Sequence, residues 1–173
     1  MFREIWTLPR RLLAELDPPM PYVVASVTDP PPDGEPAKVP QRWGLRDVLR
    51  LEFHDFDPPR HCPWAEYPSR LAIGPEAETN LIGVLAMRCE QAQQFAVWAT
   101  GWHTRDVPLL VIHCEAGVSR SVAMGLAAVE AFGAMMSPRT GNGGTLPRPE
   151  RATNQWVYWI TKHALRDATG GKS

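Results

Sequence analysis

No part of the sequence restricts the fold more than the apolar run LLVI at residues 109–112, which follows Pro108 and leads directly into HCEAGVSRS. A run that is apolar at every position predicts a strand buried on both faces, as is typical of parallel sheets covered by helices. Two further runs, PYVVASV at 21–27 and DVLRLEF at 47–53, also fit strands, and turn-rich loops follow both. We therefore predict an α/β fold with a mostly parallel central sheet flanked by helices.

Three other segments are expected to be helical. From Glu76 to Thr100 there is no proline and apolar side chains recur at roughly helical spacing, which predicts one long helix or two abutting helices. A second helix is expected from Ser119 to Met136, ended by the Pro- and Gly-rich residues 137–149. The last is amphipathic, from near Glu150 to about Leu165, and the polar residues 166–173 are expected to form a flexible tail.

Length and composition exclude several classes of protein. The 173 residues fit one domain over 1–173, with a core from about 20 to 165, and no apolar run is long enough to cross a membrane. Arg and Glu interrupt the N-terminal segment, so we expect no secretion signal. A net charge of −1 argues against nucleic-acid partners, and three cysteines at no metal-type spacing argue against a metal site or a disulfide framework. We expect a cytoplasmic protein with neither membrane nor nucleic-acid partners and without cofactor or metal.

The turn that follows the buried strand is predicted to bind an anion. A strand that turns sharply into a helix leaves backbone N–H groups converging at the positive end of the helix dipole, which favours a thiolate at Cys114 and bound oxyanions. Arg120 can grip two oxygens with its planar guanidinium, Gly117 permits a tight turn or a close ligand, and Ser121 can donate to the sulfur. The residues whose backbone is expected to surround phosphate are Glu115, Ala116, Gly117, Val118, Ser119 and Arg120.

The stretch HCEAGVSRS at 113–121 matches the pattern H-C-x-x-G-x-x-R-S. It resembles the signature loop of the cysteine-dependent protein tyrosine phosphatase superfamily, above all its compact dual-specificity and bacterial members. The resemblance implies the protein tyrosine phosphatase fold and metal-independent hydrolysis of a phosphomonoester through a phosphocysteine on Cys114. In this mechanism Arg120 holds the phosphate and His113 orients the loop. The implied substrate is phosphotyrosine, with phosphoserine or phosphothreonine as further possibilities, in protein. Phosphate, sulfate or vanadate should bind the same loop.

The resemblance also implies a general acid, an Asp on a loop upstream of the nucleophile. HDFDPPR offers Asp55 and Asp57, and we prefer Asp55 because it comes sooner after the predicted strand. Either Asp could instead be a turn residue, and His54 could tune or replace them. The gap from Asp55 to Cys114 is longer than is usual in compact members, with residues 58–74 apparently inserted.

Other functions stay open at this point. One is a phosphatase for a small metabolite, similar to the phytases; another is a catalytically silent phosphate-binding module, against which the intact Cys114 and Arg120 argue. Glu115 is expected to be solvated on the rim, where its charge argues against heavily anionic substrates. Cys62 and Cys89 are expected to be a loop thiol and a helix-core thiol, with a disulfide to an oxidised Cys114 as the alternative.

Overall fold

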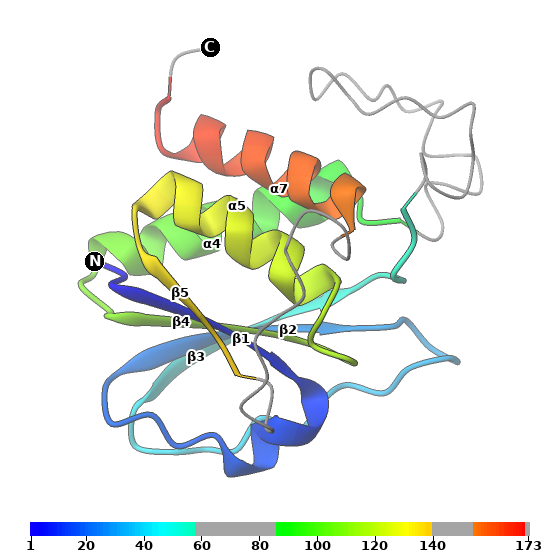
Figure 1. Cartoon of the computed structure of the whole chain (residues 1–173), viewed down its shortest axis with the longest axis horizontal. Helices are drawn as coiled ribbons and strands as arrows, with labels where there is room; N and C mark the ends of the chain where they lie inside the picture. Colours follow the sequence, from blue (N-terminus) through cyan, green and yellow to red (C-terminus); the bar gives the residue numbers. More distant parts are fainter. Residues whose placement is uncertain (58–85, 140–153, 172–173) are drawn as a thin grey trace.

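The computed structural model describes residues 1–57, 86–139 and 154–171 of the chain (Figure 1). The described strands form one five-stranded sheet in the order β3-β2-β4-β1-β5, and every pairing in it is parallel. The predicted α/β class with a parallel central sheet is therefore confirmed. The elements in chain order are β1 (Glu4–Pro9), the 3-10 helix η1 (Arg10–Glu15), β2 (Tyr22–Thr28), β3 (Leu45–Glu52), α4 (Cys89–Thr104), β4 (Leu109–Cys114), α5 (Arg120–Phe132), β5 (Met135–Pro138) and α7 (Gln155–Ala168).

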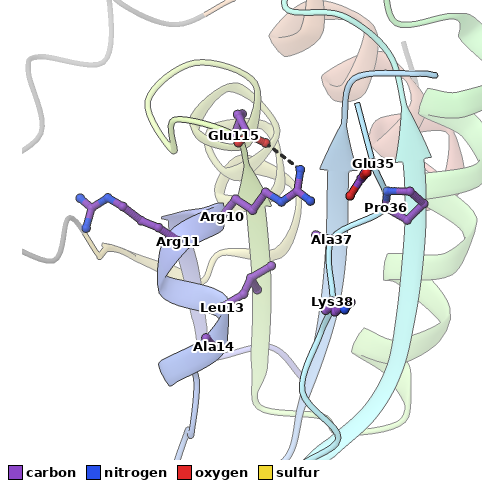
Figure 2. Close-up of a pocket in the computed structure, with 9 residues that line it drawn as sticks. All are labelled: Arg10, Arg11, Leu13, Ala14, Glu35, Pro36, Ala37, Lys38 and Glu115. Atoms are coloured by element: carbon purple, nitrogen blue, oxygen red, sulfur yellow. Dashed lines mark hydrogen bonds and ion pairs between the residues drawn. The ribbon is translucent and has the colours of Figure 1, made fainter. Parts of the chain in front are cut away.

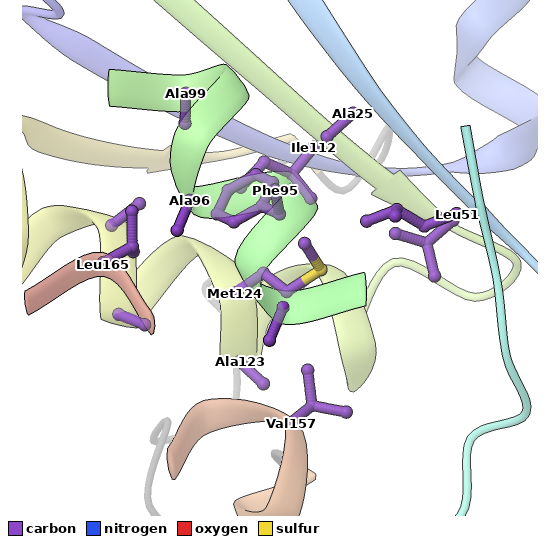
Figure 3. Packing of buried hydrophobic residues seen from close by; sticks show 14 of the residues in the cluster. Ala25, Leu51, Phe95, Ala96, Ala99, Ile112, Ala123, Met124, Val157 and Leu165 are labelled. Atoms are coloured by element: carbon purple, nitrogen blue, oxygen red, sulfur yellow. The ribbon is translucent and has the colours of Figure 1, made fainter. Parts of the chain in front are cut away.

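The two faces of the sheet are covered differently. Helices α4, α5 and α7 lie together over one face (Figure 1), and their apolar side chains form the larger core with that face, including Phe95, Ile112, Met124 and Val157 (Figure 3). On the other face, η1 packs a smaller cluster around Leu13. All six residues of β4 are buried between the two clusters, which explains why its sequence is apolar without alternation. Each fully buried large aliphatic side chain contributes about 1.5–3 kcal/mol to folding.

Parallel pairing brings the carboxyl ends of four strands to one edge of the sheet. Pro9 at the end of β1 pairs with Cys114 at the end of β4, and Ser26 in β2 pairs with His113. Farther along the same edge, Thr28 of β2 pairs with Glu52 of β3. The segments that follow these strands therefore meet at this edge, where open parallel sheets bind their ligands.

The N-terminal residues contain a strand that sequence analysis missed. Strand β1 lies between β4 and β5 in the sheet interior, so the core starts with Phe2 and Ile5 and not near residue 20. Polar and charged residues adjoin this short strand. Its sequence has neither the alternation of apolar and polar residues nor the long apolar run that would distinguish a strand from a loop. Its burial comes from partners about a hundred positions away, as the pairing of Glu4 with Leu109 shows.

The expected helix boundaries need correction. The predicted helix at 76–100 is α4 at Cys89–Thr104 in its described part, and residues 76–85 lie outside the described residues, as do 140–153. The helix expected to reach Met136 ends at Phe132, because Gly133 adopts a left-handed φ of 65° and residues 135–138 then pair with β1 as strand β5. Helix α7 continues to Ala168, into the segment expected to be flexible. No helix in the described part of the chain has the length and apolar character needed to span a membrane.

Candidate active site

The turn between β4 and α5 packs directly against the end of β1. Strand β4 ends at Cys114 and α5 begins at Arg120, so five residues make the connection. Gly117 has a φ of 73°, and a Cβ added there would lie 2.3 Å from the backbone nitrogen of Pro9. Glycine is therefore required both by the left-handed backbone and by the close approach to β1. The predicted sharp strand-to-helix turn is present.

Cys114 is held inside this turn. The residue is 2% exposed, and its Sγ lies 3.2 Å from the Oγ of Ser121, which is itself buried in the first turn of α5. The first N–H groups of a helix have no partner within the helix and carry the positive end of its dipole. Cys114 therefore lies beside both the hydroxyl of Ser121 and the start of α5.

Arg120 connects the signature turn to the ends of β2 and β3. Its side chain is 4% exposed, and one terminal nitrogen donates to Asp29 Oδ1 (2.7 Å) and to the Phe53 carbonyl (2.6 Å). His54 Nδ1 lies 3.6 Å from the same oxygen of Asp29. The Nε of Arg120 is buried and has no hydrogen-bond partner among the described residues. A buried, unsatisfied donor on a fixed guanidinium is costly unless an oxyanion completes its hydrogen bonds.

Asp55 is brought against the signature turn from a distant part of the sequence. Its Oδ1 accepts hydrogen bonds from Ser119 Oγ (2.7 Å) and from Asn154 Nδ2 (3.0 Å), while the residue itself stays exposed. The amide of Asn154 also donates to the Phe56 carbonyl, and its oxygen accepts from Val157 N (2.9 Å), so that Asn154 caps α7. Asp55 is therefore fixed between the signature turn and the start of α7.

Asp57 has a different environment. It is 5% exposed, and its Oδ2 accepts a hydrogen bond from the backbone nitrogen of Gln155 (3.1 Å) in the first turn of α7. A carboxylate at this position satisfies one of the free N–H groups of the helix and complements its dipole. The structure thus separates the two aspartates that the sequence left as alternatives: Asp55 faces the turn, and Asp57 is buried at the helix.

His113 fastens the end of β4 to β2. It is fully buried, and its Nε2 lies 2.8 Å from Ser26 Oγ. Burial lowers the pKa of His113 to about 4, an effect strengthened by Arg10, Arg50 and Arg120 and partly opposed by the Cys114 backbone. The imidazole is therefore neutral at neutral pH and holds the strand end that precedes Cys114.

Glu115 is exposed on the rim, as expected, and it also contacts η1. Although its side chain is 55% exposed, its Oε2 lies 3.2 Å from an Arg10 guanidinium nitrogen, and the backbone nitrogen of Arg10 donates to the Glu115 carbonyl at 3.2 Å. The signature turn is thus tied to η1 by both main chain and side chain. Ala116 and Val118 are exposed on the turn, and Ser119 is half-buried.

Four residues near the site were not singled out by sequence analysis: Arg10, Ser26, Asp29 and Asn154. Asp29 had a usable signal, because it follows a predicted strand just as Cys114 does. No sequence signal pointed to Asn154, since its position depends on how α7 packs against the rest of the fold.

Sequence analysis also singled out Cys62 and Cys89, expected to be a loop thiol and a helix-core thiol. Cys89 is half-buried at the start of α4, whereas Cys62 lies outside the described residues. Among the described residues, no three His, Cys, Asp or Glu side chains gather in a way that could hold a metal ion.

Fold and site together define an α/β protein with a buried thiol, a buried guanidinium and an exposed carboxylate at the carboxyl edge of a parallel sheet. Comparison with protein-family models, with curated proteins and with solved structures gives no significant match. Support for a function therefore comes from this geometry and from the sequence motif.

Proposed function

We propose that the protein is a metal-independent phosphomonoester hydrolase of the cysteine-dependent protein tyrosine phosphatase type, acting on phosphotyrosine, and also phosphoserine or phosphothreonine, in protein. One observation carries the proposal: Arg120 is buried and fixed through one nitrogen, while its Nε has no partner in the part of the chain that the structure describes. Arg120 starts the helix that follows the turn holding Cys114 against Ser121. A dianionic phosphoryl group would satisfy this donor and the N–H groups at the start of α5.

In the first step the Cys114 thiolate attacks phosphorus in line with the leaving oxygen. The S–P bond forms as the P–O bond breaks, and Asp55 in its protonated form gives its proton to the leaving oxygen. Arg120 and the N–H groups of the turn hold the three remaining oxygens, which is where charge stabilisation lowers the barrier most.

In the second step a water molecule replaces the thiol. Asp55, now ionised, takes a proton from the water as its oxygen attacks phosphorus, and the S–P bond breaks to release inorganic phosphate. Ser121 Oγ, 3.2 Å from the sulfur, donates a hydrogen bond to the returning thiolate. The enzyme then regains its starting protonation state.

The geometry supports Asp55 over Asp57 as the acid. A general acid has to reach the leaving group, and Asp55 is exposed and contacts the signature turn through Ser119. Asp57 is buried and already accepts a hydrogen bond from the start of α7.

The test is hydrolysis of para-nitrophenyl phosphate by the reduced protein, by Cys114→Ser and by Cys89→Ser. We expect Cys114→Ser to lose activity by at least about 10³-fold, because an alcohol at this position is a far weaker nucleophile than a thiolate. Cys89→Ser is the matched control and should retain activity. Vanadate should inhibit, and a chelator should not.

Three results would contradict the proposal. Activity in Cys114→Ser equal to that of the unmodified protein would exclude the phosphocysteine, and loss of activity on chelation would exclude the metal-free mechanism. An inactive, fully reduced protein that still binds phosphate would favour a silent binding module.

A further inference from the structure

The carboxyl end of β2 places an acidic residue beside Arg120. Asp29 directly follows the last residue of β2, and its Oδ1 accepts a hydrogen bond from a terminal nitrogen of Arg120 at 2.7 Å. The Asp29 side chain is 28% exposed, whereas that of Arg120 is 4% exposed. Asp29 therefore reaches inward from the surface to a guanidinium that is almost fully buried.

Main-chain hydrogen bonds fix the backbone around Asp29. The Phe53 nitrogen donates to the Thr28 carbonyl at 3.0 Å, which keeps the segments after β2 and β3 side by side. The Gly34 nitrogen donates to the Pro30 carbonyl at 3.1 Å, and a Cβ added to Gly34 would lie 2.1 Å from the Asp29 carbonyl oxygen. The turn after β2 is therefore closely packed on Asp29, and the carboxylate approaches its partner from a fixed position.

Other acidic side chains near the signature turn contact different groups. Glu115, within the turn, pairs with Arg10 at the start of η1 (Figure 2). The Asp55 carboxylate accepts its hydrogen bonds from uncharged side chains. Among the residues that the structure describes, Asp29 is therefore the carboxylate that pairs with the Arg120 guanidinium.

The contacts of Arg120 fix the orientation of its guanidinium. One terminal nitrogen donates both to Asp29 and to the Phe53 carbonyl, while the buried Nε has no partner in the described part of the chain. The guanidinium is planar, so two acceptors on one terminal nitrogen leave the plane little freedom to rotate. The Nε–H is therefore held in one direction independently of any ligand.

We infer that Asp29 is a positioning residue for the proposed reaction: it fixes Arg120 so that the Nε–H donates to an oxygen of the phosphoryl group. The inference rests on the proposed phosphatase function. Because Asp29 acts through Arg120, the position requires an acceptor oxygen more than a negative charge. A guanidinium oriented in advance need not reorganise as the transition state forms, which lowers the barrier.

The first test compares the hydrolysis of para-nitrophenyl phosphate by Asp29→Ala, Asp29→Asn and Asp33→Ala. Asp29→Ala should lower kcat/KM by about 30-fold, because a misplaced guanidinium binds the transition state less well. Asp29→Asn keeps an oxygen that can accept the hydrogen bond and should stay within about 5-fold of the unmodified protein. Asp33 is the matched control: it lies in the same loop, is 71% exposed and comes only within 4.0 Å of His54. Asp33→Ala should change kcat/KM by less than about 2-fold.

The second test observes Arg120 directly in the folded, unmodified protein. In proton–nitrogen NMR spectra, the Arg120 Nε–H signal is the one absent from Arg120→Lys and present in Arg46→Lys. It should shift when inorganic phosphate is added, because the Nε–H then donates to a phosphate oxygen. In Asp29→Ala the shift should be much smaller at the same phosphate concentration.

The outcomes separate the two proposals. The positioning role is wrong, and the phosphatase proposal stands, if Asp29→Ala hydrolyses para-nitrophenyl phosphate within about 3-fold of the unmodified protein. The same holds if saturating phosphate leaves the Arg120 signal of an active protein unmoved. A loss above about 10-fold in Asp29→Asn, which can be assayed even where Asp29→Ala does not fold, would also contradict the role. If the unmodified protein hydrolyses no para-nitrophenyl phosphate, the phosphatase proposal fails, whereas a phosphate-dependent shift that Asp29→Ala abolishes would still support the role of Asp29.

Discussion

The two sides of the candidate site are built in different ways. Cys114 and Arg120 belong to one short segment, lie buried, and owe their positions to the strand, turn and helix that contain them. Asp55 is exposed and is held by hydrogen bonds from two other parts of the chain, Ser119 and Asn154. A locally built, buried side is suited to stable binding of phosphate. An exposed side chain held by hydrogen bonds from two other segments can adjust when the substrate arrives and leaves.

The largest expected effect tests the buried side. Arg120→Lys should reduce kcat/KM for para-nitrophenyl phosphate by about 10³-fold, because an ammonium cannot donate to Asp29, to the Phe53 carbonyl and to two phosphate oxygens together. Arg46→Lys is the matched control on an exposed strand position. A loss in Arg120→Lys of less than about 10-fold would show that the fork of the guanidinium is not needed.

The next effect tests the exposed side. Asp55→Asn should reduce kcat for phenyl phosphate by about 300-fold, and for para-nitrophenyl phosphate by much less, since a poor leaving group depends more on protonation. Asp57→Asn should keep activity and lower thermal stability, because the buried carboxylate supports α7. Steady-state kinetics on both substrates, with melting curves, would identify the acid; the reverse pattern would assign it to Asp57.

His113 gives a stability effect on the buried side. Its folded-state pKa of about 4 lies below the ordinary 6.5, so the unfolded chain binds the proton first as pH falls. The free energy of unfolding should therefore decrease by about 2.6 kcal/mol between pH 6.5 and 4, roughly 80-fold in the folding equilibrium. Urea unfolding measured across this pH range should show that the free energy of unfolding depends less on pH in His113→Asn than in the unmodified protein.

His163→Gln is the control for that experiment, because burial also lowers the pKa of His163 but the side chain is partly exposed. His163→Gln should change the pH dependence of the free energy of unfolding much less than His113→Asn does. If the free energy of unfolding of His113→Asn falls with pH as steeply as that of the unmodified protein, other groups cause the loss.

The smallest effect concerns the contact that positions Asp55. Asn154→Ser keeps a side chain able to cap α7 but is too short to reach Asp55, and should reduce kcat for phenyl phosphate by about 10-fold at nearly unchanged stability. The loss should be smaller with para-nitrophenyl phosphate, a difference that damage to the helix alone would not produce. Equal losses on the two substrates would argue against a positioning role.

The same contrast explains what could be predicted from the sequence. The buried strand, the turn at Gly117 and the contact of Cys114 with Ser121 depend on residues within a few positions of one another, and sequence analysis anticipated them. The choice between Asp55 and Asp57 depends on where α7 docks, which no local pattern encodes. Strand β1 was missed for the same reason, since its burial comes from distant partners.

The interior position of β1 also has a consequence for biosynthesis. Ribosomes release the N-terminus first, so β1 emerges long before β4 and β5, the strands on either side of it. Until about residue 114 has left the exit tunnel, both edges of β1 are unpaired, and the edge that pairs with β5 stays unpaired until about residue 138. Unpaired edges invite association with other chains. Non-local parallel pairing also slows folding. Chaperone protection of β1 during translation should therefore raise the yield of folded protein.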